Sequence, residues 1–168
     1  INGIVCDYLS IDDRAIHYGD GIFETILCHA NKLYYWQQHY QRLQASAQRL
    51  QLNCPHEQLL LDDITRLINE NSVAIDQPCA VKIILSRGTS ERGYQFAKRP
   101  ASRRIVSLSA ISRGYSSLLT EELLDGELYV CRQQLSINQD LAGLKHLNRL
   151  DNVLARNEWH SGYIDGLL

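Results

Sequence analysis

Hydrophobic residues recur at every second position, or in short continuous runs, along several stretches of the chain. This spacing is typical of β-strands with one or both faces buried. It predicts strands over residues 1–5, 22–28, 32–35, 80–85, 105–111 and 127–132, and a further strand that begins at 164. Asn31 separates two of these runs closely enough to predict a hairpin.

Three other stretches carry hydrophobic residues three or four positions apart, which is the period of a helix buried on one side. This pattern predicts helices over residues 37–52, 56–71 and 146–160. Pro55 ends the first of them, because proline has no amide hydrogen to donate. The stripe residues are Leu43, Ala47 and Leu50; Leu60, Ile64 and Leu67; and Leu147, Leu150, Val153 and Leu154.

The order of these elements predicts an α/β (α+β) protein with two domains. Residues 112–117 are small and polar, and we interpret them as the boundary. Residues 1–112 are then a small N-terminal sheet-plus-helices domain, and residues 118–168 begin a larger domain. Between two strands, residues 87–104 are expected to form a long irregular loop.

Composition narrows the class of protein. The chain has 168 residues, of which 45% are hydrophobic and 21% charged, so it can build a packed core. A net charge of −2 argues against a nucleic-acid partner, and no apolar run reaches the ~20 residues of a membrane span. Five scattered cysteines are typical of reduced thiols in a cytoplasmic protein, and no Cys/His cluster has the spacing of a metal site.

Two features suggest chemistry. Lys145 follows the apolar approach Leu141-Ala142-Gly143-Leu144, and such a setting can desolvate an ammonium and favour the neutral, nucleophilic amine. His39 and Arg42 share one helix face, which is either a polar surface or an arginine fork for a phosphate.

A third feature is the 87–104 loop, which carries six basic residues against one acidic residue. It is either a solvated charge run or an anion-binding loop in which Gly93 holds Arg92 and Tyr94 as donors. The Gly19-Asp20-Gly21 sequence is not a dinucleotide fingerprint, because it precedes a strand, lacks the third glycine and carries an acid at its centre.

Taken together, these segments resemble the fold-type IV pyridoxal-phosphate (PLP) enzymes, which include branched-chain and D-amino acid aminotransferases and 4-amino-4-deoxychorismate lyases. The resemblance runs along the whole chain in the family's order. It is carried by Ile1-Asn2-Gly3, Asp13-Arg14-Ala15, the run Tyr18-Gly19-Asp20-Gly21-Ile22-Phe23-Glu24-Thr25, His39-Tyr40-Gln41-Arg42-Leu43 and the stretch 141–150.

The resemblance implies a role for individual residues. Lys145 matches the Schiff-base lysine of the family, and Arg42 matches the arginine that binds the cofactor phosphate. Arg92, Tyr94 and Phe23 stand at positions that contact substrate in D-amino acid aminotransferases, although Tyr94 replaces a histidine there and Phe23 a tyrosine. The family also implies a homodimer with the active site near the interface.

Within the family, Lys145-His146 and Asn148-Arg149 look like the lyase signature, which implies conversion of 4-amino-4-deoxychorismate to 4-aminobenzoate and pyruvate in folate biosynthesis. The loop that follows residue 86 also looks like the lyase loop, but its residues 87–90 resemble D-amino acid aminotransferases equally well. A D- or branched-chain aminotransferase is therefore the alternative. A non-catalytic anion-binding module that uses the basic loop is an alternative of another class.

The family's large domain continues beyond the position of Leu168. It supplies a glutamate for the pyridine nitrogen and a second phosphate loop, and neither is found in this sequence. A chain of these 168 residues alone is therefore expected to be inactive.

Overall fold

The structure, a computed structural model, describes residues 1–71, 77–90, 93–96, 101–111 and 126–168. Among these residues no helix is long and apolar enough to cross a membrane. The helices are α1 (Arg14–Tyr18), α2 (Trp36–Arg49), α3 (Glu57–Glu70) and α4 (Leu150–Arg156). The strands are β1 (Gly21–His29), β2 (Lys32–Leu33), β3 (Cys79–Ser86), β4 (Arg103–Ala110), β5 (Glu127–Val130) and β6 (Tyr163–Leu167).

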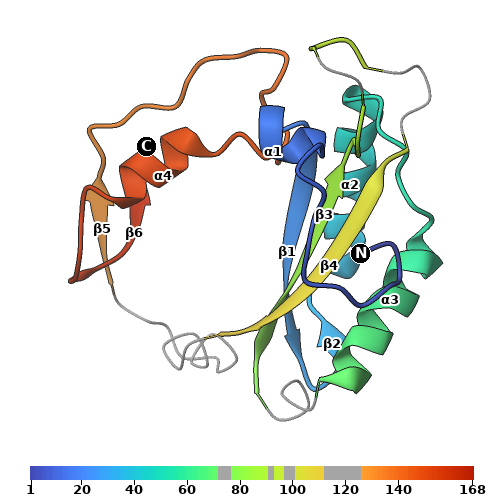
Figure 1. The fold of residues 1–168 in the computed structure, drawn as a ribbon. Coiled ribbons are helices and arrows are strands. Elements are labelled where there is room, and N and C mark those ends of the chain that lie inside the picture. Colours follow the sequence, from blue (N-terminus) through green and yellow to red (C-terminus); the bar gives the residue numbers. More distant parts are fainter. Residues whose placement is uncertain (72–76, 91–92, 97–100, 112–125) are drawn as a thin grey trace.

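Four strands form an antiparallel sheet in the order β2-β1-β3-β4, with α2 and α3 on one face (Figure 1). Strand β3 pairs with β1 along its whole length, from Gly21 opposite Ser86 to Cys28 opposite Cys79. Every second residue of each strand points to the helices, which is why the alternating pattern predicted these strands well. The buried core side chains include Ile22, Ile26, Leu43, Ala47, Leu60, Ile64, Ile68, Val81, Ile83 and Leu85.

The two long helices agree with the predicted ones to within a few residues at each end. Leu43 and Ala47 of α2 and Leu60 and Ile64 of α3 are buried against the sheet, as their spacing predicted. Helix α3 begins where the His56 side chain accepts a hydrogen bond from the Gln58 amide, a capping contact that satisfies one free amide of the first turn.

The predicted helix over 146–160 is wrong at its start, because α4 begins only at Leu150. Residues 145–147 are extended and pair with β1 instead. The Phe23 amide donates to the Lys145 carbonyl at 2.9 Å, and the Leu147 amide donates to the Gly21 carbonyl at 3.0 Å. This edge of β1 is open, since β2 pairs only with Cys28 and His29. An open edge provides backbone groups that an extended segment can satisfy and a helix cannot.

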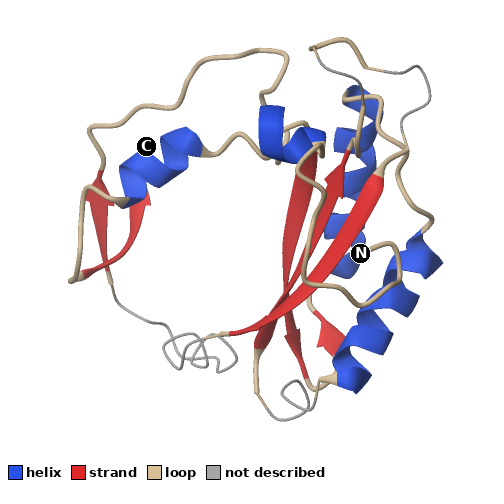
Figure 2. Cartoon of the chain, viewed as in Figure 1, coloured by secondary structure: helices blue, strands red, loops and turns tan. Residues whose placement is uncertain are grey.

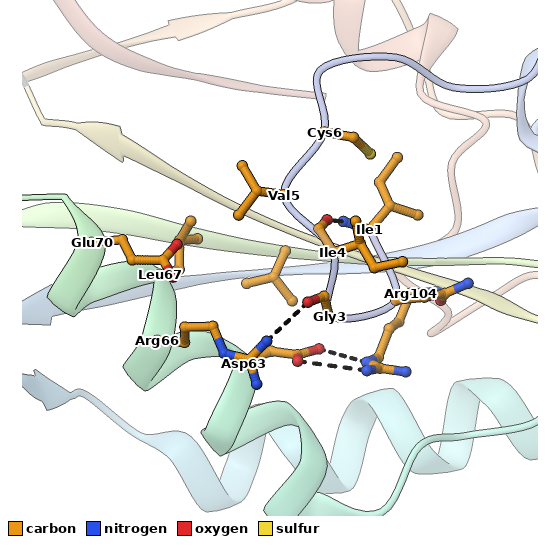
Figure 3. A pocket seen from close by; sticks show the side chains of 12 residues that line it. Ile1, Gly3, Ile4, Val5, Cys6, Asp63, Arg66, Leu67, Glu70 and Arg104 are labelled. Carbon is orange, nitrogen blue, oxygen red and sulfur yellow. Dashed lines mark hydrogen bonds and ion pairs between the residues drawn. The ribbon is translucent and has the colours of Figure 1, made fainter.

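The N-terminus also differs from its prediction. Residues 1–5 form a turn rather than a strand, and Asn2 and Gly3 both have positive φ. The segment is held by the Arg66 side chain, which donates to the Gly3 carbonyl, and by the Asn2 side chain, which accepts from the Arg104 amide. Beside the segment, Asp63 pairs with Arg104 at 2.5 Å (Figure 3). The cavity beside it, of about 100 Å³, contains none of the predicted site residues.

A helix also appears where the sequence predicted only a polar connector around residues 12–14. Helix α1 is capped by Asp13, whose carboxylate accepts from the Ala15 amide at 2.9 Å.

The end of the chain forms a separate two-stranded parallel sheet, β5-β6, joined through α4 (Figure 2). Strand β6 confirms the strand predicted to begin near 164. Residues 112–117, the predicted domain boundary, lie outside the described residues, so the division at this point stays a prediction. The mixed helix-and-sheet architecture confirms the predicted α/β class.

Candidate functional site

Lys145 lies on the face of the four-stranded sheet that α2 and α3 leave open. Lys145 and Phe23 are directly opposite in the edge pairing, so their side chains emerge on the same face. The Lys145 Nζ stands 4.5 Å from the centre of the Phe23 ring. Among the described residues this ring is the one contact of the ammonium group, and no carboxylate or carbonyl is bonded to it.

Two more cations use the same ring. The Lys82 Nζ lies 5.2 Å from the Phe23 ring centre, and the Arg149 Cζ lies 5.5 Å from it. Burial, and then the charges of Arg149, Arg42 and Lys82, lower the pKa of Lys145 below its usual value, while Glu24 acts in the opposite sense. Burial is thus the largest cause of the lowered pKa of Lys145, and its cationic neighbours add to the effect.

Arg42, from α2, is bound to Glu24 on the helix-facing side of β1, and its charge acts on Lys145 without contacting it; sequence reasoning missed Glu24. Arg42 donates from Nε to Glu24 Oε1 at 2.7 Å and from Nη2 to Oε2 at 2.6 Å. His39 Nδ1 stands 2.8 Å from the same Oε2. Hydrogen bonding to Glu24 raises the pKa of Arg42.

The sequence did contain one signal for Glu24, namely its position in the alternation of inward and outward side chains along the strand. Glu24 occupies an inward position of β1 between Ile22 and Ile26, and it is 1% exposed. A buried carboxylate needs a charged partner, and the predicted His39/Arg42 face was the nearest source of one.

Tyr94 is 86% exposed, and its ring lies 5.4 Å from that of Tyr18. Its position comes from Arg14, whose guanidinium donates to the carbonyls of Gly93 and Tyr94 at 2.9 and 3.0 Å. Arg92, the other residue predicted to bind a substrate carboxylate, lies outside the described residues.

The described arginines at the two ends of the basic 87–104 stretch are ion-paired within the protein. Arg87 pairs with Asp20 at 2.7 Å, and Arg103 pairs with Asp13 at 2.6 Å. Arg104 pairs with Asp63. These three side chains are therefore structural, and the anion-binding interpretation, which assigned Arg92 and Tyr94 as donors, stays a prediction. Their acidic partners lie far away in sequence, which is why a local count of charges did not reveal the pairing.

His146 points away from Lys145, as neighbours in an extended segment do. Its Nδ1 is buried and has no hydrogen-bond partner among the described residues. Burial and the nearby charge of Arg149 lower the pKa of His146. The imidazole lines two cavities, of about 550 and about 260 Å³, and Lys145 lines neither.

The residues present fit a phosphorylated aldehyde such as PLP. Lys145 offers an amine whose pKa is lowered, which is the group that an aldehyde requires. Arg42, Arg149 and Lys82 supply three positive charges against the single carboxylate of Glu24, so the cluster can accept an anionic phosphate. Arg42 keeps one nitrogen, Nη1, without a hydrogen-bond partner in the described part of the chain, and its side chain is 47% exposed.

Comparison with known proteins agrees with this chemistry. The family model for amino-transferase class IV matches residues 21–168. An aminodeoxychorismate lyase of Vibrio harveyi is 33% identical over 94% of this chain and 55% of its own length. A D-alanine aminotransferase of Staphylococcus epidermidis is 30% identical over 88% of this chain and 50% of its own length. The crystal structure of 4-amino-4-deoxychorismate lyase from Pseudomonas aeruginosa superimposes with a TM-score of 0.75 at 33% identity, covering 99% of this chain and 59% of that one.

The chain belongs to the class IV aminotransferase family. The resemblance to fold-type IV PLP enzymes is thereby confirmed. The chain spans about half the length of the curated relatives that it matches.

Proposed function

We propose that the full-length protein is a PLP-dependent lyase that converts 4-amino-4-deoxychorismate to 4-aminobenzoate and pyruvate. The observation that carries this proposal is the partly buried amine of Lys145, held on the Phe23 ring beside Lys82 and Arg149. The lyases of Vibrio harveyi and Pseudomonas aeruginosa, each 33% identical to this chain, support the choice of reaction.

Lys145 is the proposed attachment and proton-transfer residue. Because burial and neighbouring cations lower its pKa, a larger fraction of its amine is uncharged at neutral pH than in a solvated lysine. An uncharged amine can attack an aldehyde and can later remove a proton from the substrate carbon that bears nitrogen. PLP, when bound, supplies the electron sink that makes this carbon acidic.

Arg42 is the proposed ligand of the cofactor phosphate. Glu24 fixes two of its nitrogens, which limits the rotation of a long side chain, while Nη1 has no partner among the described residues. A guanidinium that is already oriented loses less conformational entropy when it binds a phosphate oxygen.

Arg92, Tyr94 and Phe23 are proposed to contact the substrate. The substrate carries two carboxylates, and the exposed phenol of Tyr94 can donate a hydrogen bond to one of them. Phe23 also carries the Lys145 ammonium on its ring, so its contact with substrate would be made next to the reacting amine. We further propose a homodimer that functions in folate biosynthesis, as the family resemblance implies, and a cytoplasmic location, which the scattered cysteines favour.

The test uses purified full-length protein with added PLP. We expect an absorbance band of lysine-bound PLP, borohydride trapping of the cofactor on the peptide that contains Lys145, and release of 4-aminobenzoate from 4-amino-4-deoxychorismate. Lys145→Ala should lose all three signals. Lys82→Ala is the matched control for attachment: Lys82 shares the Phe23 ring, and trapping should remain on Lys145 even though loss of one cation weakens PLP binding. Trapping on any other lysine would refute the assignment.

An aminotransferase of the same family is the second candidate, and the D-alanine aminotransferase of Staphylococcus epidermidis, 30% identical to this chain, favours it. Incubation with D-alanine and 2-oxoglutarate separates the two. Transamination without formation of 4-aminobenzoate would reject the lyase. A non-catalytic anion-binding module is less well supported, because Arg87, Arg103 and Arg104 are paired with acids of the chain itself.

A further inference from the structure

Arg149 follows Lys145 by four residues, and its guanidinium bonds to the backbone around the lysine as well as lying beside the Phe23 ring. We propose that Arg149 is the positioning residue of Lys145: its guanidinium holds the carbonyls of the residues before and after the lysine and adds a further positive charge beside the same aromatic ring. This inference rests on the proposed function only for the role of Lys145.

The hydrogen bonds of Arg149 bracket Lys145. The Nε donates to the carbonyl of His146 at 2.9 Å, and an Nη nitrogen donates to the carbonyl of Leu144 at 3.2 Å. The carbonyl between them, that of Lys145 itself, accepts from the Phe23 amide. Three consecutive carbonyls are therefore held, two of them by one planar side chain, and this fixes the direction in which Lys145 leaves the backbone.

The same guanidinium acts on the amine through its charge. The Lys145 Nζ and the Arg149 Cζ lie 4.5 and 5.5 Å from the centre of the Phe23 ring, so they are at most about 10 Å apart. The pKa of Lys145 is lowered by burial first and by Arg149 second, ahead of every other charge. The charged groups that act on the amine are Arg149 from the segment before α4, Glu24 from β1, Arg42 from α2 and Lys82 from β3, with His39 bound to Glu24 and His146 beside Arg149.

Two measurements on the cofactor-free full-length protein test the inference. The first is the pH profile of acetylation of Lys145 by acetic anhydride, read by mass spectrometry, with exposed Lys32 as the internal reference. Arg149→Met should slow labelling of Lys145 about tenfold near pH 8, the size expected for one charge at about 10 Å in a medium of dielectric constant about 20. Lys82→Met removes a cation from the same ring but leaves the hydrogen bonds of Arg149 in place, and it should slow labelling of Lys145 less than Arg149→Met does.

The second measurement separates the effect of the two hydrogen bonds from Arg149 to the Leu144 and His146 carbonyls from the effect of its charge. Arg149→Lys keeps the charge but cannot hold two carbonyls in the planar fork. We expect it to label like the wild type but to exchange the amide hydrogens of Phe23 and Leu147, which close the edge pairing, about tenfold faster. If Arg149→Met does not fold, Arg149→Lys still decides the question.

An unchanged labelling profile in Arg149→Met, equal effects of Arg149→Met and Lys82→Met, or unchanged exchange in Arg149→Lys would each overturn the inference. The proposed function fails separately. A protein that shows the labelling shift but never binds PLP loses the lyase assignment, whereas a protein that binds PLP with identical labelling in wild type and Arg149→Met loses only the role of Arg149.

Discussion

Replacing Asp20 by asparagine removes the one carboxylate that two buried arginines share. Its Oδ2 accepts from Arg14 Nε at 2.8 Å and from Arg87 Nε at 2.7 Å. Each arginine side chain is 4% exposed, so neither charge can turn to solvent when the carboxylate is lost. Asparagine keeps the shape of the side chain, removes its charge and replaces one acceptor oxygen by a donor NH2, so Asp20→Asn perturbs the site without creating a cavity.

The expected cost follows from the other bonds of the two arginines. Removal of one partner from a buried ion pair costs about 3–5 kcal/mol. Both arginines keep neutral acceptors, namely Ser90 and backbone carbonyls for Arg14 and the carbonyls of Leu50 and Gln51 for Arg87. These acceptors solvate the remaining charges, so we expect the lower end, about 3 kcal/mol, or a melting temperature lower by about 6–12 °C.

The assay is urea unfolding of full-length wild type and Asp20→Asn between pH 3 and pH 7. Burial raises the pKa of Asp20, but hydrogen bonds and charges from Arg87 and Arg14 outweigh it and lower the pKa below the ordinary 3.8. A carboxyl with a lowered pKa in the folded state stabilises the protein above the unfolded value and loses that contribution as the pH falls through the folded value. The difference between the two proteins should therefore be constant above about pH 5 and shrink below about pH 4.

The matched control is Asp12→Asn, which changes an exposed acid of the same region and should cost less than about 0.5 kcal/mol. A loss below about 1 kcal/mol for Asp20→Asn at pH 7, or a difference that does not shrink in acid, would refute the reasoning about the shared carboxylate.

Three further predictions concern the site. Glu24→Gln should destabilise the protein by about 1–3 kcal/mol in urea unfolding, because it weakens two charge-assisted bonds from Arg42; a change below 0.5 kcal/mol would contradict this. Arg42→Ala should weaken PLP binding at least about tenfold and pyridoxal binding less than about twofold in fluorescence titration, since only PLP carries the phosphate; an equal loss for both would count against the phosphate role. Gly21→Ala should cost about 1–3 kcal/mol and reduce borohydride trapping of PLP, because its Cβ would lie 2.6 Å from the Leu85 carbonyl; wild-type stability and trapping would disprove this.

The helices and strands that the sequence predicted best are those buried on one face only, because their hydrophobic residues then recur at a regular spacing. Leu43 and Ala47 on one helix, and Val81 and Ile83 on a strand, contact the same core. Burial on one side imposes the period of 3.6 or 2 on the sequence, and a period is visible without knowledge of the partner. The limits of α2, α3 and β3 were therefore predicted to within a few residues.

The features that the sequence could not predict depend on partners that are distant along the chain. The stripe of Leu147, Leu150 and Leu154 is compatible with a helix, yet residues 145–147 pair with an open strand edge more than a hundred residues earlier. The basic character of Arg87 and Arg103 is visible, whereas their pairing with Asp20 and Asp13 exists only in the folded chain. Local propensity is a weak prior when tertiary hydrogen bonds compete with it.

The two most informative sequence motifs, the glycine turn at residues 19–21 and the segment around Lys145, contact each other in the folded chain. Gly19 has a φ of +60°, and a Cβ there would lie 2.5 Å from Oδ1 of Asn148, whose amide donates to the Gly19 carbonyl at 3.3 Å. A Cβ on Gly21 would come within 2.8 Å of the Leu147 side chain. The absence of side chains at both glycines therefore lets the segment that contains Lys145 approach the β1 edge.

The register of that approach decides what the lysine can do. Because successive side chains of an extended segment point to opposite faces, a slip of one residue would turn Lys145 away from Phe23 and bring His146 toward it. The glycine turn before β1 thus acts on the chemistry through strand register, even though it contributes no reactive group. Substitution of these glycines should therefore impair attachment of the cofactor to Lys145 as well as the stability of the protein.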